Sequence, residues 1–134
     1  MKKIVFLLAT LFLISACENN LKKKNENIPK EKLVEVKDGV FTEWYPGKKS
    51  IKYQGGQDEL GNRDGKWTFY AENGTELSYT QFSRGKKDGY SLVKYPNGNI
   101  HYTGEYQNDE MVGVWSTFDE KGNLLTKKEY GDRK

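Results

Sequence analysis

The sequence predicts an all-β fold, an elongated array of about four stacked antiparallel β-hairpins. Two observations support this prediction. Glycines recur at an even interval of about 24 residues in two series, Gly65, Gly89 and Gly113, and Gly74, Gly98 and Gly122. Between them lie short runs rich in aromatic and β-branched residues, which turn sequences such as Asn-Gly join in pairs. A repeat of this length suits one hairpin and its connector, so we interpret the glycines as turn residues of a stacked unit.

Residues 1–16 are expected to be a lipoprotein signal peptide. Lys2 and Lys3 precede an apolar run at residues 4–14, which is too short for a bilayer span of about 20 residues but suits a secretory signal. The run leads into a sequence that resembles a bacterial lipobox: Ile14, Ser15, Ala16 and Cys17. Since cleavage at a lipobox leaves its cysteine first in the chain and lipidated, Cys17 is the expected lipid attachment site.

Two alternatives to lipidation remain open. The segment is also compatible with plain secretion, with Cys17 near the cleavage site by chance, or with a cytoplasmic protein that has an apolar N-terminus. Cys17 is the only cysteine, so the fold contains no disulfide. We expect a lipoprotein held at a membrane outside the cytoplasm, in the outer membrane or at the cell surface if the host has two membranes.

The mature chain is expected to have two parts. Residues 17–35 form the lipidated cysteine and a flexible polar tether, because residues 18–35 contain no aromatic side chain and too few apolar ones to offset the entropy of ordering. Residues 36–134 form the repeat domain and contain every Trp and Tyr of the chain.

Four hairpins are expected, at about residues 39–54, 65–83, 89–107 and 112–130. In the first, Tyr45-Pro46-Gly47 suits a type II turn. In the next two, Asn-Gly and Pro-Asn-Gly suit a three-residue loop that a left-handed glycine closes, and residues 119–122 offer the same ending. Residues 83–89, SRGKKDG, are expected to form a longer loop between the second and third hairpins.

The repeat places equivalent aromatic residues in columns. Trp67 and Trp115 share a column in which Ser91 is the middle member, and Phe82, Tyr106 and Tyr130 form a second column. Stacked aromatic side chains are expected to supply the stability that a single hairpin lacks. The expected structural anchors of the repeat are Gly65, Trp67, Gly74, Phe82, Gly89, Gly98, Tyr106, Gly113, Trp115, Gly122 and Tyr130.

The second repeat resembles a known family. GKWTFYAENG, then Phe82 and the run from Arg84 to Gly89, is similar to the bacterial variant of the MORN repeat, a Gly-x-Trp-x-x-Tyr-x-x-Asn-Gly hairpin with an aromatic residue late in its second strand. Over about residues 39–131, the chain is similar to YwqK-type antitoxins and MORN-repeat lipoproteins. The resemblance implies a β-hairpin array that acts in interaction or scaffolding, with no shared catalytic residues.

Composition argues against several classes of function. The net charge of +3 falls by two, to +1, when Lys2 and Lys3 leave with the signal peptide, which does not favour nucleic-acid binding. His101 is the only histidine, so we expect no metal site, and no motif indicates a cofactor. The carboxylates lie mostly in expected turns, and we therefore expect no enzymatic activity.

The sequence thus predicts a non-enzymatic, lipid-anchored envelope protein. The lipid attached to Cys17 anchors the protein in the membrane, and the repeats offer a binding or scaffolding surface to a protein partner. Aromatic residues occur on both faces of the expected strands, so some remain exposed for binding, and Tyr90, Tyr95 and Tyr102 are the candidates. One alternative is a YwqK-type antitoxin that binds a toxin, and another is an envelope enzyme that acts on polysaccharide.

Overall fold

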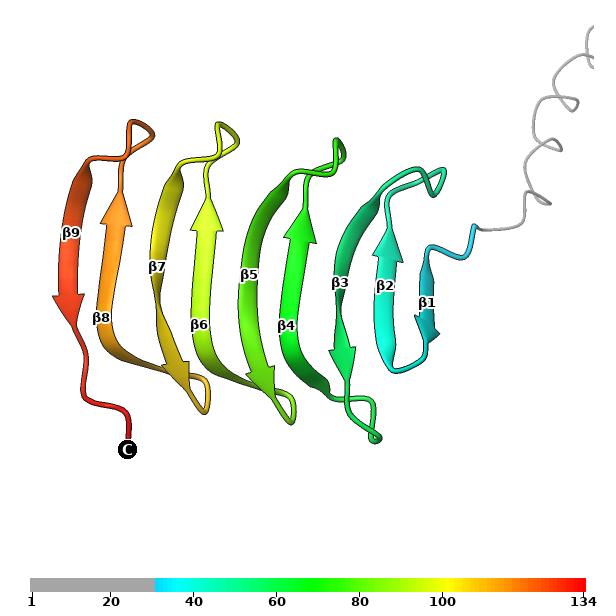
Figure 1. Ribbon diagram of the computed structural model, residues 1–134, viewed down its shortest axis with the longest axis horizontal. Helices are drawn as coiled ribbons and strands as arrows, with labels where there is room; N and C mark the ends of the chain where they lie inside the picture. The colour runs from blue at the N-terminus through cyan, green and yellow to red at the C-terminus, as the bar shows by residue number, and fades with distance from the viewer. Residues whose placement is uncertain (1–30) are drawn as a thin grey trace, which may run out of the picture. The chain divides into compact units, whose positions relative to one another are not determined.

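A computed structural model describes residues 31–134, which form one antiparallel sheet of nine strands in chain order (Figure 1). The expected signal peptide, Cys17 and most of the tether lie outside the described residues. The strands are β1 (Val34–Lys37), β2 (Val40–Trp44), β3 (Ile51–Gln57), β4 (Arg63–Tyr70), β5 (Glu76–Ser83), β6 (Lys86–Lys94), β7 (Ile100–Gln107), β8 (Glu110–Phe118) and β9 (Leu124–Glu129).

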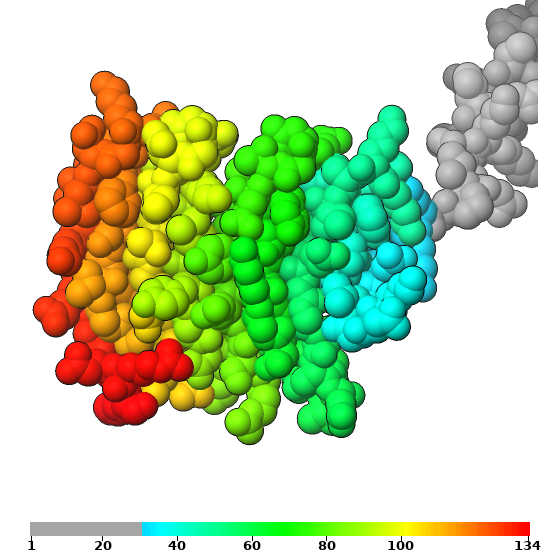
Figure 2. Space-filling view, viewed as in Figure 1, coloured from blue at the N-terminus to red at the C-terminus, as the bar shows by residue number. Residues whose placement is uncertain are grey.

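The all-β hairpin array that the sequence predicts is confirmed. The four hairpins are β2–β3, β4–β5, β6–β7 and β8–β9, and each also pairs with the next across the sheet. Figure 2 shows them as adjoining bands across the domain. No helix among residues 31–134 is long and apolar enough to cross a membrane.

A ninth strand, β1, precedes the four hairpins. It pairs with β2 from Val34 opposite Glu43 to Lys37 opposite Val40. The tether was expected to run to residue 35, whereas Val34 and Glu35 lie in this strand. All four β1 side chains are exposed, so the strand carries little of the apolar signal that marks a buried strand in a sequence.

Three of the hairpins are closed by loops of one kind, as the glycine pattern predicts. In the second hairpin, Gly74 has φ +86° and its N–H donates to Ala71 O at 2.9 Å. Gly98 and Gly122 repeat this geometry with φ of +91° and +86°. The first hairpin has the expected type II turn, in which Lys48 N–H donates to Tyr45 O at 3.0 Å and Gly47 has φ +82°.

The longer loop expected at residues 83–89 is not present. Ser83 pairs with Lys86, so only Arg84 and Gly85 connect the second hairpin to the third. Their φ values of +48° and +87° belong to a type I′ turn, whose twist matches that of antiparallel strands. The prediction of a longer loop is wrong because the Lys-rich residues 86–89 pair as the first part of β6.

The loop of the fourth hairpin and the connector between β3 and β4 share a carboxylate at their first position. Asp58 Oδ1 accepts the N–H groups of Leu60 and Asn62, and Asp119 Oδ1 accepts those of Lys121 and Asn123. The side-chain amide of the asparagine donates to the second oxygen in each loop, at 3.0 and 2.8 Å. The two loops therefore have the same motif, which connects β3 to β4 in one case and β8 to β9 in the other.

These loops should make the fold sensitive to acid. The asparagine side-chain hydrogen bonds hold the pKa of Asp58 and of Asp119 below the ordinary value. A lowered folded-state pKa stabilises the fold above the unfolded-state pKa of about 3.9, and this contribution is lost as the pH falls through the folded-state pKa. The urea midpoint of unfolding should therefore fall below about pH 4.

Urea titrations at pH 7 and at lower pH measure this effect. The variant with Asp58→Asn and Asp119→Asn should show a smaller fall than the wild type, because asparagine does not titrate. The matched control replaces the adjacent carboxylates, as Glu59→Gln and Glu120→Gln. If the control and the double Asn variant respond to acid alike, the loop hydrogen bonds are not the cause.

The sheet is a single layer with two distinct faces. Strand alternation and the pairings of Gly55 with Trp67 and of Gly65 with Phe82 bring one set of aromatic side chains to the same side. We call this side the aromatic face; it carries Phe41, Tyr53, Trp67, Phe69, Phe82, Tyr102, Tyr106, Trp115 and Tyr130. The buried apolar core is small and consists of Trp67, Phe82, Val112 and Trp115.

Candidate binding surface

The aromatic face carries two clusters, each built around a tryptophan. In the first cluster, the ring of Trp67 lies 5.3 Å from that of Phe41, 5.0 Å from Tyr53 and 6.4 Å from Phe82, measured between centroids. In the second cluster, the ring of Trp115 lies 6.2 Å from Tyr102 and 4.9 Å from Tyr106. These tilted and edge-to-face contacts are the arrangements that aromatic pairs prefer.

Each tryptophan packs flat over a glycine of the neighbouring strand. A Cβ on Gly55 would lie 2.3 Å from the Trp67 ring, and one on Gly104 would lie 2.2 Å from the Trp115 ring. The indole N–H of Trp67 donates to Gly56 O at 2.8 Å, and that of Trp115 donates to Glu105 O at 3.0 Å. Only glycine leaves room for the rings in this position.

The middle of the sheet replaces this pair with two small polar residues. Thr80 faces Ser91 across β5 and β6, and their hydroxyl oxygens lie 2.8 Å apart in a hydrogen bond. Ser91, the middle member of the tryptophan column, is 4% exposed. A polar strip therefore separates the two clusters.

The structural period of the domain is two hairpins, twice the period of the glycines. The pairs of glycine with tryptophan occur at β3–β4 and β7–β8, with the Thr-Ser pair between them. A tyrosine strap shows the same alternation. Tyr45 OH donates to Tyr70 O at 2.8 Å, and Tyr95 OH donates to Phe118 O at 2.9 Å. Ala71, at the equivalent loop position of the second hairpin, has no hydroxyl to form the strap.

A cation covers the first cluster. The guanidinium carbon of Arg63 lies 5.2, 4.8 and 5.3 Å from the ring centroids of Tyr53, Trp67 and Phe82. Such stacking contributes about 0.5–1 kcal/mol at exposed sites. The arginine occupies the space between these rings and the solvent.

The second cluster lacks such a cover and borders a groove. Met111, at the position equivalent to Arg63 two hairpins later, stands in its place. The groove has a volume of about 330 Å³ and is lined by Tyr102, Tyr106, Met111, Trp115, Thr117, Thr126, Lys128 and Tyr130. Two ammonium groups lie at its sides, Lys87 Nζ at 4.7 Å from the Tyr106 ring centroid and Lys128 Nζ at 4.7 Å from that of Tyr130.

A second hollow, of about 530 Å³, lies between the loops of the first two hairpins. Trp44, Ile51 and Tyr70 contribute its apolar part, and Lys49 and Glu72 its charges. Among residues 31–134, the buried indole N–H of Trp44 makes no hydrogen bond. This atom is covered, so it does not present a donor to a ligand in the hollow.

The structure separates the three tyrosines expected to bind. Tyr102 belongs to the second cluster. Tyr95 lies in a hairpin loop, where its ring stacks on His101 at 4.4 Å and its hydroxyl forms a strap. Tyr90 is 56% exposed on the opposite face, where the Glu105 carboxylate raises its pKa. Three residues expected to be structural anchors, Tyr106, Trp115 and Tyr130, also line the groove.

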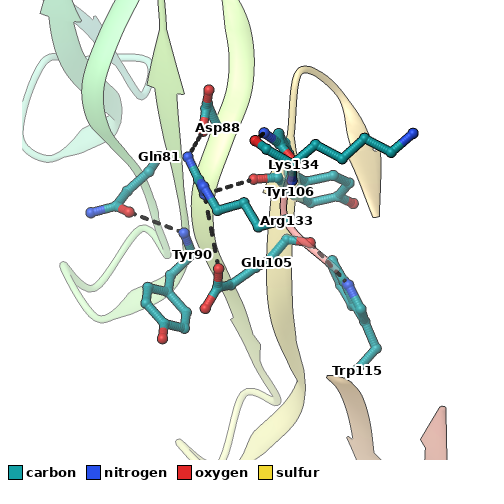
Figure 3. A network of polar contacts seen from close by, with 9 residues as sticks. Gln81, Asp88, Tyr90, Glu105, Tyr106, Trp115, Arg133 and Lys134 are labelled. Atoms are coloured by element: carbon teal, nitrogen blue, oxygen red, sulfur yellow. Dashed lines mark hydrogen bonds and ion pairs between the residues drawn. The ribbon is translucent and has the colours of Figure 1, made fainter. Parts of the chain in front are cut away.

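The C-terminal segment after β9 folds back along the sheet and contacts β6 and β7. Figure 3 shows Arg133 between Asp88, the main-chain oxygen of Tyr106, at 3.5 Å, and the carboxylate of Glu105, at 3.9 Å. Lys134 N–H donates to Gln107 Oε1 at 2.7 Å. These contacts join the end of the chain to β6 and β7, beside the second cluster.

Lys66 and Lys94 form structural ion pairs with Glu76. Glu76 accepts hydrogen bonds from Lys66 at 3.1 Å and Lys94 at 3.5 Å. Burial raises the pKa of Glu76, but these two lysines outweigh it and the pKa is lowered. Within residues 31–134, no group of three or more His, Cys, Asp or Glu side chains is placed to hold a metal ion.

The fold and the two clusters define a hairpin-repeat protein with one aromatic face. Two adjacent segments, residues 87–108 and 111–132, match the family model of the MORN repeat variant. They are the third and fourth hairpins, and MORN repeats are generally binding or scaffolding motifs. Searches of curated proteins and of solved structures found no match. The resemblance at GKWTFYAENG, in the second hairpin, stays a prediction.

Proposed function

We propose that this protein is a non-enzymatic, lipid-anchored envelope protein whose aromatic face binds a partner. The observation that carries the proposal is the single-layer sheet, which has no second layer of secondary structure over the aromatic face in residues 31–134. Tyr102, Tyr106 and Tyr130 are half-buried on this face, and aromatic side chains that keep part of their surface accessible are typical of interaction sites.

The N-terminal sequence supports a location of the protein at a membrane, outside the cytoplasm. Ile14, Ser15 and Ala16 before Cys17 favour cleavage and lipidation outside the cytoplasm, and the polar residues that follow suit a tether. Lipid attachment fixes the domain near a membrane and raises its local concentration for a partner at the same surface. We therefore propose a protein partner of the envelope.

Labelling with radioactive palmitate in the native host tests the anchor. The wild type should incorporate label and fractionate with membranes, and Cys17→Ser should do neither. A lysine substitution beside the lipobox, Lys22→Gln, serves as the control and should keep the label. Unlabelled, full-length protein in the cytosol would contradict the anchor and favour the antitoxin alternative.

Site-specific photo-cross-linking in living cells tests the binding face. A photoreactive residue at Ser78, on the aromatic face and outside the groove, should capture an envelope protein. The same residue at Val114, which is 45% exposed on the opposite face, should capture none. Equal capture at both positions would contradict a one-sided docking surface.

A further inference from the structure

We propose that the groove beside the second aromatic cluster binds a carboxylate-bearing saccharide. This inference rests on the proposed binding role of the aromatic face and names the ligand chemistry at one end of that face. It is supported by three features of the described residues: an internal comparison, the charge of the groove and the lack of free backbone groups on its floor.

A comparison of the two clusters shows that the groove is open because of one residue difference, since the fold around both clusters is the same. Tyr53, Trp67 and Phe82 correspond to Tyr102, Trp115 and Tyr130 two hairpins later. The first three rings surround the guanidinium of Arg63. The second three line the groove, together with Met111 at the position of the arginine. The chain therefore fills one aromatic site with its own side chain and leaves the other accessible.

The charge around the groove favours an anion. Its lining residues include Lys128 and no carboxylate. Lys87 lies on the opposite side, over Tyr106. Neither lysine takes part in an ion pair among residues 31–134, where the ion-paired cations are Lys52, Lys66, Lys94 and Arg133. An ammonium held over an aromatic ring keeps its donors for an incoming carboxylate and loses little freedom on binding.

The floor of the groove favours a sugar over a peptide. β7 and β8 pair with strands on both sides, so their backbone groups are committed to the sheet. An extended peptide on this floor would leave its own N–H and C=O groups without partners, which is costly. A sugar ring instead offers a C–H face to the half-buried Tyr102 and Tyr106 and hydroxyls to Thr117 and Thr126. The volume falls within the range of about 300–1,000 Å³ for small-molecule sites.

Nuclear magnetic resonance on the full chain with Cys17→Ser, which prevents lipidation, tests the proposal. The probe is a trigalacturonate, and the matched neutral probe is galactotriose. The indole N–H signals of Trp115 and Trp67 report on the two clusters in one spectrum, because each indole donates to the backbone beside its own cluster. The acidic probe should shift the Trp115 signal in a saturable manner and leave the Trp67 signal in place.

Two substitutions distinguish charge from shape. Lys128→Gln should weaken trigalacturonate binding by about tenfold or more, as expected for a lost charge-assisted hydrogen bond. Its matched control is Lys127→Gln, because Lys127 pairs with Ser116 on the opposite face of the same strand. Met111→Arg should abolish binding, because it places an arginine where the first cluster has Arg63, and the folded spectrum should persist.

Several outcomes would overturn the proposal. Equal binding of galactotriose would remove the role of the lysines, and stronger binding of an acidic peptide such as triglutamate would replace the sugar. A shift of the Trp115 signal by arginine amide, without one by trigalacturonate, would show a cation site like that of Arg63. Absence of any shift refutes the saccharide, whereas capture of an envelope protein at Ser78, outside the groove, would still support the proposed function.

Discussion

Replacing Trp67 by alanine should lower the free energy of unfolding by about 3–5 kcal/mol. Trp67 is 3% exposed and contacts Phe41, Tyr53 and Phe82, so it holds the strands of the first cluster together. Its loss leaves a cavity that a single-layer sheet has no second layer to fill. The same change also removes the hydrogen bond from its indole to Gly56 O.

Chemical denaturation of the full chain with Cys17→Ser measures this loss. Thermal unfolding of the same proteins gives a second measure: for a domain of this size, the melting temperature should fall by about 4–8 °C for each kcal/mol lost. Tyr90→Ala is the matched control, because this aromatic side chain is 56% exposed on the opposite face, and it should cost about 0.5 kcal/mol or less. Similar losses for the two variants would show that the first cluster is not the core.

Gly104→Thr should destabilise the protein by about 1–3 kcal/mol, and the loss should disappear when Trp115 is replaced by serine. The threonine Cβ would lie 2.2 Å from the Trp115 ring, which must move and give up its hydrogen bond to Glu105 O. With Trp115→Ser, the new pair copies the hydrogen-bonded Thr80 and Ser91 of the middle of the sheet.

A double-mutant cycle with Gly104→Thr, Trp115→Ser and the combination measures the coupling. All four proteins are compared in a stabilising osmolyte, so that the least stable of them stays folded. The coupling energy should be about 1–3 kcal/mol, with the double variant no less stable than Trp115→Ser alone. Additive losses would mean that the glycine does not serve the tryptophan.

The hairpins were predictable because their signals are local. Glycines that need positive φ, as at Gly74, Gly98 and Gly122, mark loops in a sequence whatever their surroundings. The turn at Arg84 and Gly85 was missed because its first residue adopts positive φ without being Asn, Asp or Gly. β1 was missed because its exposed side chains give no burial pattern, while its pairing with β2 is a contact that the sequence does not display.

The site was less predictable because it depends on which face each residue occupies. Tyr90 and Tyr102 lie on opposite faces of neighbouring strands, a relation set by the register across the turn between them. The groove depends on Met111 standing where an arginine stands earlier in the chain. The available signal was the equivalence of Arg63 and Met111 across two repeats, which a search at the period of a single repeat does not reveal.

The alternation of glycine-tryptophan and threonine-serine pairs limits how such an array changes length. Removing the third hairpin would place Trp115 beside Thr80, and removing the second would place Gly55 beside Ser91, so neither change restores a pair of glycine with tryptophan. Removal or duplication of two hairpins keeps every tryptophan beside a glycine and every tyrosine strap beside its acceptor. Gain or loss of repeats in chains built this way should therefore occur in pairs of hairpins, with each step adding or deleting one complete aromatic cluster.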